Sequence, residues 1–222
     1  MPRKVAALLI ALAVAGGPAG AGETYDLMFR EGTLSTASGV PYAVTLTYDV
    51  EVAGPTVERG AAPAYRVALS ADAEGSAVLT QLQQGDAGPP RRLGAFPTGA
   101  GNPVIMYFLE STLRDVASVT GSSPFYLRNR IKEALLGPAD ITAATIDFGG
   151  TPIQAQQVTI HPFAEIPEKS RMGALGDLAL SVVVADAVPG WYGQLAARTP
   201  DATAPGAYAH VLTLTDATEA HP

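Results

Sequence analysis

The chain has 222 residues, of which 47% are hydrophobic and 16% are charged, and its formal net charge at pH 7 is −7. This apolar content excludes intrinsic disorder, and the absence of cysteine excludes a disulfide framework, a thiolate nucleophile and cysteine-ligated zinc or iron–sulfur centres. Because phosphate binding relies on clustered lysine and arginine, we expect no nucleic-acid partner for this acidic chain.

The first 21 residues have the three-part pattern of a secretory signal peptide. Arg3 and Lys4 precede an apolar run over 5–15, and the small residues Ala19-Gly20-Ala21 follow. As a helix this run rises only ~16 Å, at ~1.5 Å per residue, which is too short to cross a hydrocarbon core of ~30 Å. We therefore predict cleavage after Ala21 and a periplasmic or secreted mature protein without a transmembrane segment.

Alternation of apolar and polar residues predicts strands in the first part of the mature chain. The firmest pattern covers 42–52, where every second residue is a large apolar one. Weaker alternation predicts strands over 24–30, 64–70 and 77–84, so an antiparallel meander is expected. Gly- and Pro-rich connections separate these strands, at 53–55 and 85–90.

A helical hairpin is predicted over 103–136, in the middle of the chain. Asn102-Pro103 and Ser123-Pro124 each place a capping residue before a proline, which is favoured in the first helical turn. Gly137-Pro138 marks the end of the second helix. The opening segment 104–109 also fits a buried strand, and this alternative stays open. Apolar residues at helical spacing define one face of each helix: Ile105, Leu109, Leu113 and Val116 in the first, and Leu127, Ile131 and Leu135 in the second.

The strand pattern returns after the hairpin and completes the fold class. Alternation over 141–148 and 153–160 flanks Gly149-Gly150, which predicts a tight hairpin. Further strands are expected over 178–184, near Trp191 to Leu195, and over 208–214. The chain is thus predicted to be a mainly β (α+β) protein, with a curved antiparallel sheet or incomplete β-barrel of about nine strands and a helical hairpin inserted mid-chain. We expect a single domain over 22–216 and a flexible tail over 217–222.

Sequence motifs do not favour catalysis. The chain has no Gly-x-Ser-x-Gly nucleophile motif, no phosphate-binding loop and no complete dinucleotide fingerprint. The three histidines, His161, His210 and His221, are too scattered for a metal site, so we expect no metal and no cofactor. A buried histidine bonded to a neighbour is the favoured interpretation of His210. A hydrolase that uses His210 remains an alternative, and no catalytic residue is assigned.

Apolar and aromatic side chains suggest a ligand site beneath the hairpin. An amphipathic hairpin is a natural cover for the concave face of a curved sheet, and a gap beneath it would hold an apolar ligand. We therefore favour a non-enzymatic protein that binds a hydrophobic or lipid-like ligand between the sheet and a helical lid. The candidate ligand-binding residues are Tyr107, Leu109, Leu113, Phe125, Leu127, Ile131, Trp191 and His210.

Basic residues of the hairpin suggest an alternative function. The segment 91–133 carries six of the twelve lysines and arginines of the mature chain but only three acidic residues, which gives it a net charge of +3 on an acidic body. Arg128 and Lys132 lie one helical turn apart and, with Arg130, are the candidate contacts to an anion or acidic partner. The alternative is a structural or assembly module that docks such a partner, for example an envelope protein.

Overall fold

The computed structural model describes residues 21–30, 44–58, 60, 64–72, 76–82, 89–97 and 101–219. The expected signal peptide lies outside the described residues except for Ala21, and its cleavage stays a prediction. The start of the firmest predicted strand, Tyr42 and Ala43, also lies outside them, as does His221. Within the described part of the chain, none of the helices combines the length and the apolar character needed to cross a bilayer.

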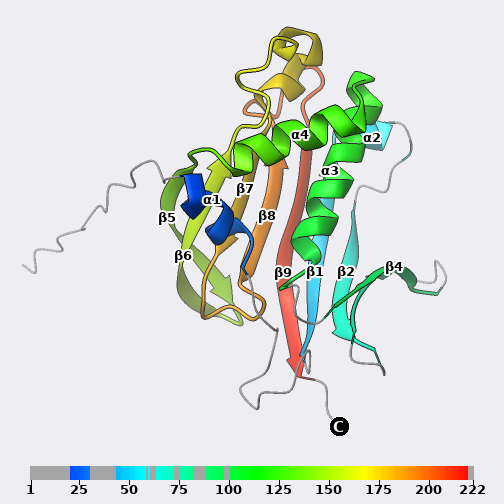
Figure 1. Ribbon diagram of the computed structural model, residues 1–222. Helices are drawn as coiled ribbons and strands as arrows, with labels where there is room; N and C mark the ends of the chain where they lie inside the picture. The colour runs from blue at the N-terminus through cyan, green and yellow to red at the C-terminus, as the bar shows by residue number, and fades with distance from the viewer. Residues whose placement is uncertain are drawn as a thin grey trace, which may run out of the picture.

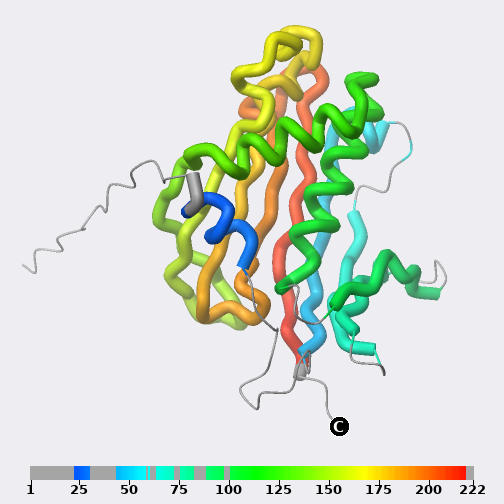
Figure 2. Tube along the Cα trace, viewed as in Figure 1, coloured from blue at the N-terminus to red at the C-terminus, as the bar shows by residue number. Residues whose placement is uncertain are grey.

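Within the described residues, nine antiparallel strands form a single open, curved sheet, which confirms the predicted fold class (Figure 1). Their order across the sheet is β4-β3-β2-β1-β9-β8-β7-β6-β5, so the last strand joins the two halves by pairing with the first (Figure 2). The strands are β1 Val44–Ala53, β2 Ala64–Ala71, β3 Ala77–Leu82, β4 Arg91–Phe96, β5 Asp140–Phe148, β6 Thr151–Ile160, β7 Ala179–Val184, β8 Tyr192–Arg198 and β9 Ala209–Glu219.

Strand β1 shows how the sequence pattern defines the core face. Tyr48, Val50 and Val52 are buried, whereas Asp49 and Glu51 between them are exposed. Strand β1 is hydrogen-bonded to β2 on one side and to β9 on the other, so its apolar residues lie near the middle of the sheet. The predicted alternation over 44–52 is therefore confirmed, and the carboxylates of its polar face are surface groups.

The predicted helical hairpin is confirmed, and the alternative of a strand over 104–109 is excluded. Helix α3 spans Val104–Thr120 and helix α4 spans Pro124–Leu135. Gly121 ends α3 in a left-handed conformation, with φ of 72°, which glycine adopts without the Cβ penalty. Asn102 accepts a hydrogen bond from the Val104 amide and donates to the Tyr48 hydroxyl, which ties the start of α3 to β1.

The strand predicted over 24–30 is wrong, because these residues belong mainly to helix α1, Ala21–Met28. Thr24 and Met28 are buried four residues apart, which is helical spacing. The Thr24 hydroxyl donates to the Gly137 carbonyl, and Tyr25 stacks on Phe29 at the same four-residue spacing. The inward residues Thr24, Leu27 and Met28 recur at i, i+3 and i+4, and this helical spacing, together with packing against α4, β6 and β7, prevails over a short alternation at Tyr25, Leu27 and Phe29.

Other departures from the predictions lie in the connections and at the end of the chain. The expected connection at 53–55 leads into a short helix, α2 Pro55–Glu58, and a 3₁₀ segment, η1 Lys169–Asp177, precedes β7. Arg91 and Arg92 lie in the edge strand β4, outside the hairpin itself. Strand β9 continues to Glu219, so residues 217–219, expected in a flexible tail, pair with β1 instead.

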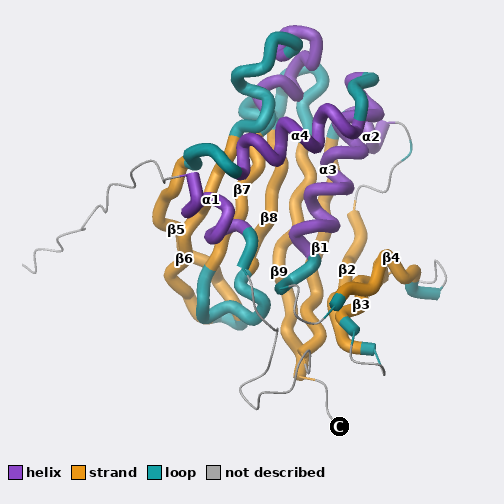
Figure 3. Tube along the Cα trace, in the orientation of Figure 1, coloured by secondary structure: helices purple, strands orange, loops and turns teal. Residues whose placement is uncertain are grey.

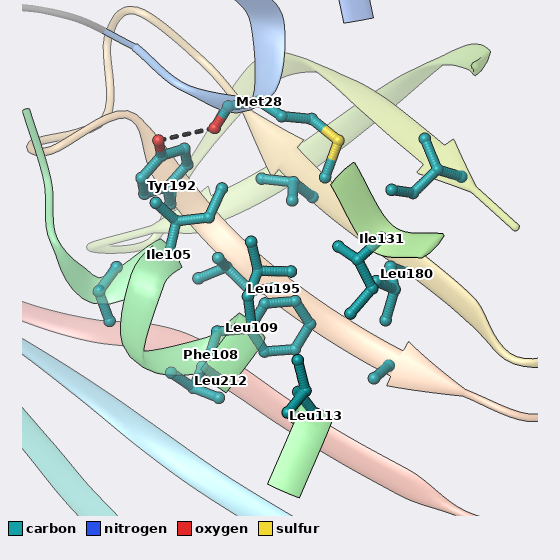
Figure 4. Packing of buried hydrophobic residues seen from close by; sticks show 14 of the residues in the cluster. Met28, Ile105, Phe108, Leu109, Leu113, Ile131, Leu180, Tyr192, Leu195 and Leu212 are labelled. Atoms are coloured by element: carbon teal, nitrogen blue, oxygen red, sulfur yellow. Dashed lines mark hydrogen bonds between the residues drawn. The ribbon is translucent and has the colours of Figure 1, made fainter. Parts of the chain in front are cut away.

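Helices α1, α3 and α4 form a layer on one face of the sheet (Figure 3). Between this layer and the strands lies the core, in which Phe108, Leu127, Leu195 and Leu212 are fully buried. Figure 4 shows Phe108 of α3 close to Leu195 and Leu212 of the sheet. The hairpin therefore covers the apolar face of the sheet, as the sequence predicts.

Candidate functional site

An apolar groove of about 120 Å³ opens between α3, α4 and the residue that follows α1. Leu109 and Leu113 lie one turn apart on α3, and Ile131 and Leu135 lie one turn apart on α4. This spacing brings two pairs of apolar side chains to the side on which the helices face each other. The groove is lined only by helix residues and Phe29, namely Phe29, Met106, Leu109, Glu110, Leu113, Arg128, Ile131, Lys132 and Leu135.

Charged side chains stand at the rim of this interhelical groove. Arg128 of α4 donates through Nε and Nη2 to the two carboxylate oxygens of Glu110 on α3, at 3.0 Å each. Such a two-pronged pair links the helices across the groove and neutralises both groups. Lys132, one turn further along α4, is exposed and forms no ion pair with any residue that the structure describes. The rim therefore presents one unpaired positive charge beside an apolar floor.

The structure brings five of the predicted site residues together. Leu109, Leu113 and Ile131 line the groove, and Arg128 and Lys132 lie at its rim. The sequence analysis placed the ligand between the sheet and the lid, but no strand residue lines this groove. The helix–sheet interface instead holds fully buried side chains. The position of the predicted site therefore shifts from beneath the hairpin to the crevice between its helices.

Three predicted residues of α4 lie apart from the groove. Leu127 is fully buried in the core, and Phe125 is 70% exposed at the start of the helix. Arg130 forms an ion pair with Glu133 and lies over the ring of Tyr126, with its guanidinium carbon 5.3 Å from the ring centre. The guanidinium of Arg130 is therefore already bound by side chains of its own helix.

Tyr107 and Trp191 are also outside the groove. The Tyr107 hydroxyl is 2.8 Å from that of Tyr65 on β2, and burial raises the pKa of both groups. Trp191 precedes β8 in a left-handed conformation, with φ of 66°, close to Gly101 before α3. Both side chains pack against the core rather than against a ligand space.

His210 lies in a buried polar contact between β9 and α3. Its Nδ1 is 2.9 Å from the Thr112 hydroxyl, and its Nε2 has no hydrogen-bond partner among the described residues. Burial lowers the pKa of His210 to about 4, so the ring is neutral at pH 7. The nearby carboxylate of Asp115 accepts a hydrogen bond from Tyr208 instead, at 2.7 Å. This arrangement matches the favoured interpretation of a buried histidine bonded to a neighbour.

The remaining candidates are a metal site and a second surface depression, and among the described residues neither gathers a cluster of charged side chains. Among the described residues, no group of three or more His, Asp or Glu side chains is placed to hold a metal ion. A second depression, of about 310 Å³, lies at the end of β1 beside the loop before β9. Mainly Ala, Gly and Pro line it, with Glu58 and Tyr208, and it contains none of the predicted site residues.

Four residues of the interhelical groove were missed as site residues by the sequence analysis, namely Phe29, Met106, Glu110 and Leu135. Phe29 was assigned to a strand, and only the helical spacing of Thr24 and Met28 could have indicated its position. Met106 lies off the apolar stripe of α3 and is 45% exposed, which the sequence pattern gives no reason to expect of a ligand contact.

Comparisons with known proteins give no match in sequence and a weak similarity in structure. No protein-family model matches the sequence, and no curated protein matches it. Among solved structures, the chain is similar to the Mycobacterium tuberculosis lipoprotein LppX, with a TM-score of 0.36 and 13% sequence identity. The similarity covers 80% of this chain and 88% of LppX. At this TM-score the similarity carries no argument about function.

Proposed function

We propose that this chain is an exported protein that binds a single-chain anionic amphiphile, such as a fatty acid, in the interhelical groove. The observation that carries the proposal is the apolar groove with the unpaired Lys132 at its rim. An acyl chain would lie against Leu109, Leu113 and Ile131, and the ammonium of Lys132 would attract a carboxylate. Export is part of the proposal because of the leader pattern over residues 1–21.

The size of the groove limits the ligand. A cavity of ~150 Å³ holds one benzene molecule, and this groove measures about 120 Å³. It therefore accepts a short stretch of one acyl chain and not a lipid with two chains. Burial of about four methylene groups contributes about 3 kcal/mol at ~0.8 kcal/mol each. A contribution of this size favours an exchangeable complex, as a carrier requires.

The alternative functions have less support from the site. Docking of an acidic partner relied on Arg128, Arg130 and Lys132, but the two arginines already pair with Glu110 and Glu133. Hydrolysis by His210 would need access to its ring, which is 1% exposed. No carboxylate is hydrogen-bonded to that ring among the described residues.

Filling the groove is expected to weaken ligand binding. Leu109→Trp places a larger, aromatic side chain in the groove. It should raise the Kd for a fluorescent sixteen-carbon fatty acid at least tenfold, because the acyl chain then loses its apolar contacts. The measurement is a titration of the delipidated protein in solution, with thermal unfolding to verify that the variant is folded.

A second variant covers the outcome in which Leu109→Trp does not fold. Met106→Glu changes a groove residue that is already 45% exposed, and it should also weaken binding by placing a carboxylate beside the ligand. Phe125→Glu is the matched control, since this exposed residue belongs to the same hairpin but does not line the groove. Unchanged affinity in both groove variants, or no binding by the native protein, would refute the proposal.

A further inference from the structure

Large exposed apolar side chains gather on the helical side of the molecule. Among the described residues they are Tyr25 on α1, Met106 on α3, and Phe125 and Leu136 at the two ends of α4, with exposures of 42%, 45%, 70% and 53%. Helices α1, α3 and α4 all lie on one face of the sheet (Figure 3). The two most exposed of the four, Phe125 and Leu136, stand at the two ends of α4, which makes this helix the candidate interaction surface.

Three exposed residues of α4 and its C-cap residue Leu136 form a stripe, and the exposed Glu133 lies beside it. Phe125, Arg128, Lys132 and Leu136 are all exposed, at successive spacings of three, four and four residues. At ~100° per residue these positions fall within an arc of about 80° on the helix surface. Phe125 and Leu136 are about 16 Å apart along the axis, at ~1.5 Å per residue, with the two cations between them. This set of four residues is termed the α4 stripe.

The charge of α4 differs from that of the rest of the chain. Helix α4 contains three basic residues and one acidic residue, whereas the chain as a whole has a net charge of −7. Arg128 and Arg130 are paired with Glu110 and Glu133, so an anionic surface would repel most of the protein and attract this helix through Lys132, which no described acidic residue pairs. Cations near an anionic bilayer contribute to binding when they lie within about a Debye length of it.

We propose that the α4 stripe docks this protein on an anionic lipid bilayer. Phe125 and Leu136 enter the boundary between headgroups and acyl chains, while the unpaired Lys132 extends to the lipid phosphates and Arg128 keeps its pair with Glu110. The stripe fits a bilayer better than a protein, because two separated apolar side chains flanking cations need no complementary pockets on a fluid surface.

The α4 stripe adjoins the interhelical groove. Arg128 and Lys132 belong to both, so docking through the stripe brings the rim of the groove to the lipid surface. A single-chain amphiphile would then enter the groove from the bilayer without crossing bulk water. This step deepens the proposed function and rests on it for the identity of the cargo, whereas docking itself can be tested separately.

Vesicle binding tests the docking surface. The native protein is expected to co-float with vesicles of phosphatidylcholine and phosphatidylglycerol, and less with phosphatidylcholine alone. The double variant Phe125→Ser/Leu136→Ser, which keeps the charge, should lower partitioning at least tenfold. Lys132→Glu should weaken partitioning and reduce its salt dependence. Arg66→Glu makes the same charge change at an exposed position on β2 and should leave partitioning unchanged.

A site-specific probe identifies the occupant of the stripe. Because the chain has no cysteine, Phe125→Cys creates a unique site for an environment-sensitive dye. Its emission should shift to the blue on addition of anionic vesicles, whereas the same dye at Arg66→Cys should not respond. Equal partitioning of the double variant and the native protein would overturn the proposal, as would absence of vesicle binding. So would a photo-crosslinker at position 125 that captures an envelope protein instead of lipid.

The docking proposal and the proposed function can fail independently. Phe125→Ser/Leu136→Ser should retain fatty-acid binding in solution, since neither residue lines the groove. Loss of vesicle binding with retained fatty-acid binding therefore supports the stripe and the groove together. Vesicle binding by a protein that binds no fatty acid refutes the proposed cargo and leaves docking in place.

Discussion

Phe108→Ala is expected to lower the free energy of unfolding by about 3–5 kcal/mol, the usual cost of removing a fully buried phenylalanine ring. Phe108 is 0% exposed and lies between α3 and the central strands, beside Leu195 and Leu212 (Figure 4). Its ring centre is also 5.6 Å from that of His210. The substitution removes apolar contacts and leaves a cavity at the interface of the two layers. Urea unfolding measures the loss as a lower midpoint at unchanged slope.

The matched control is the same substitution in the same hairpin. Phe125 is 70% exposed, so Phe125→Ala should change the free energy of unfolding by no more than about 0.5 kcal/mol. Similar losses in both variants would show that the hairpin is not packed on the sheet through Phe108. That outcome would contradict the layered fold from which the groove follows.

Sequence patterns predicted those helices and strands in which the same face lies against the core along the whole element. Strand β1 lies between two neighbours with one face on the core, so a period of two extends through it without interruption. The tight turn between β5 and β6 was predicted equally well from Gly149-Gly150. In the structure both glycines have positive φ, at 61° and 77°, as such a turn requires. The hairpin helices could be predicted because caps and apolar spacing agreed over α3 and α4.

The candidate site could be predicted only in part, because it depends on how three helices cross. Helical spacing identified Leu127 and Ile131 as members of one apolar face, and both are buried in the core, yet only Ile131 also lines the groove. Which part of a stripe meets the sheet is set by the crossing of α3 and α4, which no local pattern encodes. Phe29 reaches the groove only because α1 packs on α4, a contact between segments about 100 residues apart.

The polar contact beneath α3 gives the fold a specific sensitivity to acid. The pKa of His210 is about 4 in the native protein because burial disfavours the charged ring, and it is 6.5 in its ordinary environment. As pH falls below 6.5, the unfolded chain binds a proton at His210 that the native protein does not bind. Stability is therefore lost as pH falls from about 6.5 to 4, and the loss is complete below 4. Asp115 on α3 acts in the opposite direction, since burial raises its pKa and protonation favours the native state.

Replacement of His210 by a group that does not titrate is expected to remove this loss. In His210→Gln the amide can still bond to Thr112. The contribution of Asp115 to the pH dependence of stability is present in both proteins and cancels in the comparison. Between pH 7 and pH 4 the native protein should lose about 3 kcal/mol more unfolding free energy than the variant, at ~1.4 kcal/mol for each pH unit of pKa shift. Urea unfolding at a series of pH values measures this difference. Parallel pH profiles for the two proteins would mean that His210 is hydrated or charged in solution, and hence that the α3 interface opens to water.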